Sequence, residues 1–370
     1  MNKYELIECD NLYQIKALRD IGVDVKKGDL GGCVENEGNL SQDGEAWIYK
    51  SARAQGNSIV LGDACISGSA VVSGEAWVDN NAKIFGEANV CGSARVSDSA
   101  CISGNARISG CAWVSDTALV SGDAIVSGDA WVFGDARVSG NALVDDTTYV
   151  FGNARVSGGA RVSGDARVSG GACVKSNAEV KGNAQVYGNA CISGKAEVYG
   201  EACVYGCAWV SGGAIVLGNA RVSGKAYVSG IAEVYGEAHI AEEIIVKRGE
   251  YKEDLTNNRN YLSLLRNEFS VSPTRDIVIL YKKVNSTSDK GVYTSCFDPD
   301  FIYEDGKTAI SEKVDGRMIS CANGLHVSTP LYWREGDTLI AVEINVKNII
   351  TIQDGKVRVS KLKVIEECAK

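Results

Sequence analysis

A six-residue repeat without a single insertion occupies more than half of this chain. From Ala46 to Glu243 the sequence contains 33 consecutive units of the form Ala-x-Val-x-Gly-x. The first position is Ala in 31 units, the third is Val or Ile in 32, and the fifth is Gly in 26. In four other units the fifth residue is Asn or Asp, which tolerate a left-handed backbone best after Gly: Asn80, Asp98, Asp116 and Asp146. The fifth position is therefore predicted to be a turn residue with a positive φ.

The spacing of the repeat predicts a closed coil. The first and third residues of a unit point to the same side of an extended segment. A hairpin sheet would bury very little on so small an Ala–Val face, whereas three short strands per turn close a triangular prism. Val and Ile then fill the interior and Ala fits the corners. Each coil takes 18 residues, so the repeat predicts about 11 coils, and all three Pro lie after it, as strand pairing requires.

Two segments carry a resemblance to a known fold. Val138-Ser-Gly-Asn-Ala142 and Val162-Ser-Gly-Asp-Ala166 each place an aliphatic residue four positions before a small one. This pattern resembles the left-handed parallel β-helix of the hexapeptide-repeat proteins. The left-handed sense comes from that resemblance, because parallel crossovers are usually right-handed. The opening segment from Leu12 to Trp47 resembles hexapeptide-repeat proteins of phages and prophages, which implies an origin in a mobile element.

The repeat lacks the residues that enzymes of this type use. Many hexapeptide-repeat proteins are acyltransferases with a catalytic His on the coil, and others resemble γ-type carbonic anhydrases, which need three His for zinc. This chain has only two His, His239 and His326, and none between Ala46 and Glu237. A general base is therefore missing from the coils. We expect a rigid rod without an active site, a metal or a cofactor.

Residues 18 apart should stack on one face of the prism, and one face gathers aromatic side chains. Stacked rings can simply stabilise a sheet. A long apolar stripe on a solvent face is more typical of an interface. We therefore predict a homo-oligomer, dimeric or trimeric, with binding of another protein as the second possibility. The predicted interface residues are Trp77, Trp113, Trp131, Phe133, Tyr149, Phe151, Tyr187 and Tyr205.

Charge and cysteine content limit the other partners. The formal net charge is −9, which makes nucleic-acid binding unlikely. Four arginines form a predicted basic belt that could bind a small anion or nucleotide, although a solvated surface is the simpler interpretation: Arg137, Arg155, Arg161 and Arg167. Cys173 and Cys191 should be stacked neighbours with free thiols.

The chain start and the cysteines together predict a location. The first residues show neither a signal-peptide pattern nor an apolar window long enough to span a membrane. The 13 Cys are scattered through the repeat and not arranged as a disulfide framework. Reduced thiols in a cytoplasm, bacterial if the chain is phage-encoded, are the simplest interpretation.

Both ends of a prism need caps, and the sequence around the repeat supplies them. We predict an N-terminal cap at 1–45, the β-helix at 46–243, a helical connection at 244–275 and a C-terminal β-rich or α+β domain at 276–370. Within the connection, Glu250 to Phe269 is predicted to be a helix with Leu255, Leu264 and Leu265 on its apolar face. The fold class is mainly β.

Any specific chemistry is expected in the C-terminal domain. The segment Gly324–Trp333 places a His, two hydroxyls and two aromatic rings together. With Tyr281, Lys282 and Glu343 on predicted strands, it resembles the small sheet domains of ADP-ribosyltransferase-like proteins. It also resembles uncharacterised phage domains with a Gly-Leu/Phe-His-Val/Ala motif.

The first resemblance implies His326 and Glu343 as candidate catalytic residues of an acyl- or ADP-ribosyl-type transferase. The chain departs from it, with Lys282 where a transferase would often have Arg and without a Glu-x-Glu pair. A buried, hydrogen-bonded His326 is the simpler interpretation. The leading prediction is therefore a non-catalytic scaffold that presents the C-terminal domain and an aromatic face to a second copy, or to a host or virion protein.

Overall fold

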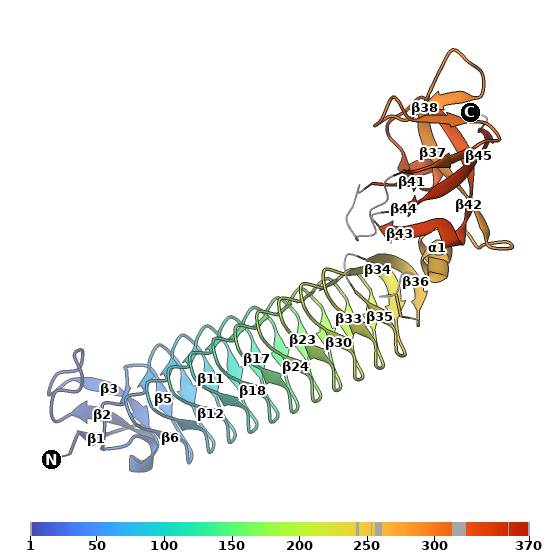
Figure 1. The fold of residues 1–370 in the computed structure, drawn as a ribbon. Coiled ribbons are helices and arrows are strands. Elements are labelled where there is room, and N and C mark those ends of the chain that lie inside the picture. Colours follow the sequence, from blue (N-terminus) through green and yellow to red (C-terminus); the bar gives the residue numbers. More distant parts are fainter. Residues whose placement is uncertain are drawn as a thin grey trace. The chain divides into compact units, whose positions relative to one another are not determined.

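The structure, a computed structural model, describes residues 2–241, 244–252, 254–255, 261–312, 323–353 and 355–368. It is mainly β, with a parallel β-solenoid of about 12 turns within residues 33–251 and a β-rich C-terminal region (Figure 1). The predicted fold class is thus confirmed, and the left-handed sense stays a prediction. The chain divides into two compact units, residues 1–206 and 207–370.

An antiparallel cap opens the first unit. Strands β1 (Tyr4–Cys9) and β2 (Leu12–Ala17) form a hairpin within the segment 1–45, where the sequence predicts a cap. Strand β3 (Leu30–Val34) pairs antiparallel with β2 and parallel with β5 (Arg53–Ala54), and the short 3-10 helix η1 (Glu37–Asn39) follows. The parallel pairings therefore begin at Cys33, ahead of the first repeat unit.

A buried lysine anchors this cap to the first coil. The side chain of Lys3 is fully buried, and its Nζ donates hydrogen bonds to the carbonyl oxygens of Asp43 (3.2 Å) and Ala46 (3.0 Å). Burial lowers the pKa of Lys3 to about 8. The hydroxyl of Tyr4 donates to the carbonyl of Leu40 over 2.6 Å. The first strand is thus tied to the segment that leads into the repeat.

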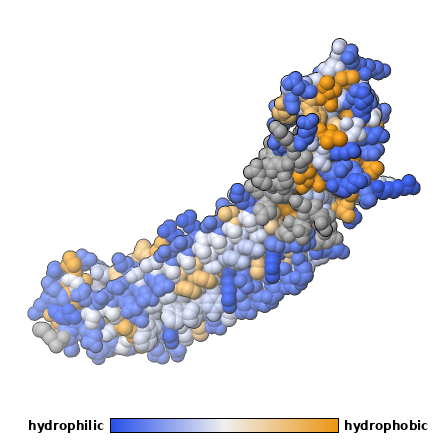
Figure 2. Space-filling view, viewed as in Figure 1, coloured by the Kyte–Doolittle hydropathy of each residue, from blue (hydrophilic) through white to orange (hydrophobic). Residues whose placement is uncertain are grey.

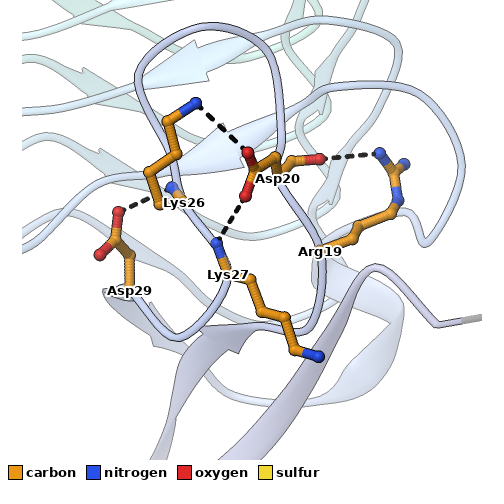
Figure 3. A network of polar contacts seen from close by, with 5 residues as sticks. All are labelled: Arg19, Asp20, Lys26, Lys27 and Asp29. Atoms are coloured by element: carbon orange, nitrogen blue, oxygen red, sulfur yellow. Dashed lines mark hydrogen bonds and ion pairs between the residues drawn. The ribbon is translucent and has the colours of Figure 1, made fainter.

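The connection between β2 and β3 is held by a network of polar contacts (Figure 3). The carboxylate of Asp20 accepts hydrogen bonds from the backbone nitrogen of Lys27 (2.9 Å) and from Nζ of Lys26 (3.3 Å). These bonds lower the pKa of Asp20. Arg19 donates to the carbonyl of Asp20, and the backbone nitrogen of Lys26 donates to Asp29. This exposed loop is therefore ordered by its own side chains.

The coils of the first unit are built from three ladders of two-residue strands. Each strand pairs with the strand 18 residues further along, as in Arg137↔Arg155 and Val138↔Val156. The third residue of the unit points inward, and Val138 and Val162 are both fully buried, as predicted. Backbone hydrogen bonds such as that from Trp113 N to Ala130 O, at 2.8 Å, join successive coils.

The strands of the three ladders are as follows. The first ladder holds β6 (Ile59–Val60), β9 (Trp77–Val78), β12 (Arg95–Val96), β15 (Trp113–Val114), β18 (Trp131–Val132), β21 (Tyr149–Val150), β24 (Arg167–Val168), β27 (Gln185–Val186) and β30 (Cys203–Val204). The second holds β5, β8 (Val71–Val72), β11 (Asn89–Val90), β14 (Arg107–Ile108), β17 (Ile125–Val126), β20 (Leu143–Val144), β23 (Arg161–Val162), β26 (Glu179–Val180) and β29 (Glu197–Val198). The third holds β4 (Trp47–Ile48), β7 (Cys65–Ile66), β10 (Lys83–Ile84), β13 (Cys101–Ile102), β16 (Leu119–Val120), β19 (Arg137–Val138), β22 (Arg155–Val156), β25 (Cys173–Val174) and β28 (Cys191–Ile192).

The turn prediction is confirmed at the fifth position of the unit. Gly128 has a φ of +66° and Asp146, its neighbour in the next coil, has a φ of 59°. A Cβ atom on Gly128 would lie 2.7 Å from the backbone nitrogen of Asp146, so this particular turn has no room for a side chain at Gly128. Lys50 is an exception, because the following residue, Ser51, takes the positive φ instead.

The second unit begins with further coils, formed by β31 (Trp209–Val210), β32 (Ile215–Val216), β33 (Arg221–Val222), β34 (Tyr227–Val234), β35 (His239–Ile240) and β36 (Ile245–Tyr251). Here the predicted helix boundary is wrong. Glu250 and Tyr251 belong to β36, because they pair with Glu233 and Val234 of β34 and extend the solenoid. Helix α1 (Tyr261–Phe269) is the one α-helix among the described residues, and 256–260 lie outside them.

Helix α1 contacts both the last coil and the C-terminal sheets. The carboxylate of Glu268 accepts hydrogen bonds from the backbone nitrogen of Lys247 (2.6 Å) and from the hydroxyl of Tyr251 (2.9 Å). Burial raises the pKa of Tyr251, so this hydroxyl remains a donor. At the other end, the hydroxyl of Tyr261 donates to the carbonyl of Ile350. No helix in the described ranges has the length and apolarity needed to cross a lipid bilayer.

Two antiparallel sheets make up the C-terminal region. The larger has the order β39 (Ile302–Glu304), β38 (Val292–Thr294), β37 (Ile277–Ser286), β42 (Thr338–Asn345), β45 (Lys361–Glu367) and β40 (Thr308–Ile310). The smaller contains β41 (Leu325–Val327), β44 (Lys356–Val359) and β43 (Ile349–Gln353). Residues Val357–Val364 contribute to two strands, because the chain bends at Ser360 and then pairs with the other sheet. Two short 3-10 helices, η2 (Pro330–Tyr332) and η3 (Val346–Asn348), connect these strands.

Candidate functional site

A row of aromatic rings between two arginines lies along the first ladder of the solenoid. Trp113 and Trp131 have ring centroids 4.9 Å apart, and those of Trp131 and Tyr149 are 5.8 Å apart. The guanidinium of Arg95 lies 6.0 Å from the Trp113 ring, and that of Arg167 lies 5.6 Å from Tyr149. The five side chains occupy consecutive coils because the register advances by one coil every 18 residues.

A second row of rings lies beside the first, on the residues that follow each strand of this ladder. Phe133 and Phe151 stack with centroids 5.0 Å apart and planes 2° apart, and Tyr187 and Tyr205 stack at 5.0 Å and 4°. Parallel rings at this distance contribute favourable stacking beyond the apolar area that they bury. Stacking therefore stabilises neighbouring coils, as the simpler interpretation of the sequence holds.

Two of these stacked rings remain exposed, and the others are half-buried. Trp131 is 40% exposed and Tyr187 is 37% exposed. Trp77 is also 40% exposed, but Arg95 separates it from Trp113, and its Nε1 donates to a carboxylate oxygen of Asp79 over 3.0 Å. The structure thus brings the eight predicted interface residues onto one ladder and joins seven of them by direct ring contacts.

The four arginines of the predicted basic belt are distributed over all three ladders. Arg137 and Arg155 are direct neighbours in the third ladder. Arg161 pairs with Leu143 and Glu179 in the second, and Arg167 lies in the first, against Tyr149. The belt encircles the coil, and only its first two members share a face. Anion binding by these residues stays a prediction.

The cysteine prediction can be placed on the third ladder. Cys173 and Cys191 lie opposite each other in adjacent strands, and both thiols are free. Burial and the neighbouring thiol raise the pKa of Cys191, which keeps it protonated. Among the residues that the structure describes, no group of three His, Cys, Asp or Glu side chains is placed to hold a metal ion.

A pocket of about 1330 Å³ opens in the C-terminal region. Its buried lining includes Lys282 of β37, Tyr303 of β39 and Leu325 of β41, and His326 lines it as well. The two sheets approach each other here through the bridge between Tyr281 and Ser328. The pocket is large enough for a drug-sized organic molecule.

Lys282 is the most unusual residue of this pocket. It is only 5% exposed, and its Nζ donates a hydrogen bond to the carbonyl oxygen of His326 over 3.2 Å. The same nitrogen lies 5.2 Å from the centre of the Trp333 ring and 5.5 Å from that of Tyr303. Burial lowers the pKa of Lys282 to about 8. The neighbouring rings offer cation–π stabilisation but no opposite charge.

The sequence contains a signal for this buried lysine. Val278, Leu280 and Val284 of the predicted strand all point to the core, and Lys282 continues that alternation. The family resemblance places Lys282 on a strand and marks it as a departure from Arg, but it does not predict its burial. A charged residue in phase with the buried face of a strand is the pattern that could have identified it.

The two candidate catalytic residues occupy different places. His326 lines the pocket, where burial and the positive charges of Lys282, Lys356 and Arg358 lower its pKa to about 4. Glu343 does not belong to the pocket lining. It lies on the opposite face of β42 from the buried Val342 and Ile344, and it pairs with Ile279 and Lys363. The described residues therefore do not assemble this pair into one site.

Comparison with known proteins supports the solenoid. A family model described as the YdcK β-solenoid repeat matches residues 160–175. The matched segment contains β23, β24 and β25, one strand from each ladder, and so corresponds to about one coil. A search of curated proteins found no match to this chain.

Proposed function

We propose that this chain is a non-catalytic scaffold that presents its C-terminal region and self-associates through the aromatic face of the first ladder. The observation that carries the proposal is the exposure of Trp131. This ring contacts Trp113 and Tyr149 within its own ladder and is still 40% exposed. A stripe of such rings on a solvent face is typical of a protein interface.

The regularity of the coils supports a scaffold role. Successive coils are joined by backbone hydrogen bonds of 2.8 Å, such as those of Trp113 with Ala130 and of Trp131 with Thr148. Stacked turns without room for a Cβ, such as that at Gly128, limit how one coil can shift over the next. A scaffold of this kind holds the exposed rings in a fixed row, so little conformational entropy is lost when they are covered.

The charge of the ladder favours a second copy of the chain as the occupant. From Ile59 to Cys203 the outward strand positions of the first ladder include Arg95 and Arg167 but no Asp or Glu. Guanidinium groups bind well to exposed aromatic faces. A second copy can therefore offer its arginines to the rings of the first.

The test is the mass of the intact assembly. We expect the full chain to form a dimer or trimer by light scattering after size-exclusion chromatography, and Trp131→Ser to shift it towards the monomer. Trp209→Ser is the matched control, because Trp209 is 42% exposed but lies outside the first ladder. A monomeric wild-type chain, or equal effects of the two substitutions, would contradict self-association on this face.

A host or virion protein is the alternative occupant of the same surface. In that case the wild-type chain is a monomer when pure, and a heteromeric complex disappears with Trp131→Ser but not with Trp209→Ser.

A further inference from the structure

The amine of Lys282 carries a positive charge that the described residues do not neutralise. Its contacts are one carbonyl oxygen and two aromatic rings, with no carboxylate within ion-pair distance in the described part of the chain. An ammonium group has three N–H donors, and the described residues accept a hydrogen bond from one of them. Buried charges in proteins are normally paired, because an uncompensated charge is costly away from water.

The amine and its neighbours meet in the same pocket. Lys282, Tyr303, His326 and Trp333 all line it, so a molecule in the pocket can reach this group of side chains. Lys282 is fixed in position by the hydrogen bond to β41 and by the packing of its stem among core residues of β37. The group is thus rigid and faces a space large enough for a ligand.

The outer part of the pocket lining is apolar and exposed. Leu331 is 97% exposed, Phe297 is 76% exposed and Ile310 is 55% exposed. Figure 2 shows patches of apolar residues on the surface of the C-terminal region. Large apolar side chains exposed next to one pocket are typical of a binding site for a molecule with an apolar part.

Exposed carboxylates in the pocket lining disfavour a ligand that carries several negative charges. Asp298, Asp300, Glu312 and Glu335 all line the pocket and are exposed, against the basic Arg334 and Lys356. A ligand with several negative groups would be repelled by these side chains. A single anionic group deep in the pocket would instead contact Lys282.

We propose that this pocket binds a small organic monoanion, whose anionic group pairs with the ammonium of Lys282 and whose aromatic or alkyl body lies against Phe297 and Leu331. The indole of Trp333 lines the same pocket, 5.2 Å from the Lys282 amine. The proposal is independent of self-association through the solenoid, because it uses only residues of the C-terminal region.

The test uses two probes of the same shape and different charge, naphthoate and naphthylmethanol. Calorimetric titration of the full chain near neutral pH should show binding of naphthoate and much weaker binding of the alcohol. Lys282→Met, which keeps an unbranched stem, should weaken naphthoate binding by about tenfold or more. Lys283→Met is the matched control, because Lys283 is the next residue of β37 but does not line the pocket.

A second variant addresses the apolar part of the ligand and does not risk the fold. Leu331 is almost fully exposed, so Leu331→Ser should leave the structure intact and weaken both probes severalfold. Equal affinity for the acid and the alcohol, unchanged naphthoate binding in folded Lys282→Met, or no binding of either probe would overturn the proposal.

Discussion

The side-chain nitrogen of Lys282 donates its hydrogen bond to the backbone carbonyl of His326, and this 3.2 Å contact joins β37 to β41. Burial lowers the pKa of both residues, and the charge of Lys282 further lowers that of His326. A positive charge on Lys282 or on His326 therefore destabilises the folded state. This predicts a pH dependence of stability in two separate ranges.

The first range belongs to Lys282. Its pKa falls from 10.5 to about 8 on folding, so between these values the unfolded chain keeps a proton that the folded chain has lost. The free energy of unfolding should therefore rise with pH through this range, by roughly 3 kcal/mol. The groups that face the amine are the thiol of Cys296 and the neutral side chains of Tyr303 and His326.

The comparison is with Lys282→Met, measured by thermal unfolding at a series of pH values. Lys3, which titrates in the same range, contributes equally to both proteins and cancels in the difference. We expect wild type to gain stability relative to the variant as the pH rises above about 8. A constant difference would show that Lys282 titrates normally.

The second range belongs to His326. Its pKa falls from 6.5 to about 4, so between these values the unfolded chain binds a proton that the folded chain does not. The free energy of unfolding should fall as the pH is lowered through this range. Because the ring is half-buried and partly screened, the loss is on the order of 1 to 2 kcal/mol. Urea unfolding of wild type and His326→Gln at several pH values measures it, and parallel profiles would contradict it.

The solenoid could be predicted from sequence because each of its physical requirements recurs in every coil. Val138 fills the interior, its neighbouring Ala fits a corner and the fifth residue turns with a positive φ. In a repeat of this kind the local sequence pattern also predicts the long-range strand pairing, because each residue contacts its equivalent one coil later. The stacking partners of Trp131 followed from counting 18 residues in each direction.

The C-terminal region offered no such repetition. Its strands were visible as apolar runs, but pairing between residues as distant as Lys282 and His326 depends on which sheet each strand joins. Ser360 illustrates the difficulty, because the segment Val357–Val364, in which apolar and polar residues are mixed, divides between two sheets at this residue. Motif resemblance alone makes Glu343 a catalytic candidate together with His326, whereas strand alternation directs Glu343 to the face of β42 opposite the buried Val342 and Ile344.

The turn residues of the solenoid should tolerate substitution very unequally. Gly128→Ala would place a Cβ 2.7 Å from the backbone nitrogen of Asp146 and force a positive φ on Ala. We expect a loss of about 1 to 3 kcal/mol in unfolding free energy. Asp129→Ala, at the exposed adjacent residue, should change it by less than about 0.5 kcal/mol. Comparable thermal unfolding of the two variants would argue against tightly stacked turns.

The stacked phenylalanines allow stabilisation within the coil to be measured separately from association. Phe133 and Phe151 are parallel at 5.0 Å, so a double-mutant cycle with Leu at both positions should give a coupling energy of about 0.5 to 1.5 kcal/mol.

The matched cycle combines Phe133→Leu with Tyr187→Leu, which lie in the same row but three coils apart. That cycle should be additive, because each ring stacks on a different partner. Both cycles are measured by chemical unfolding at dilutions where the chain is monomeric. Equal coupling in the two cycles would mean that the rings act through the coil as a whole and not through direct stacking.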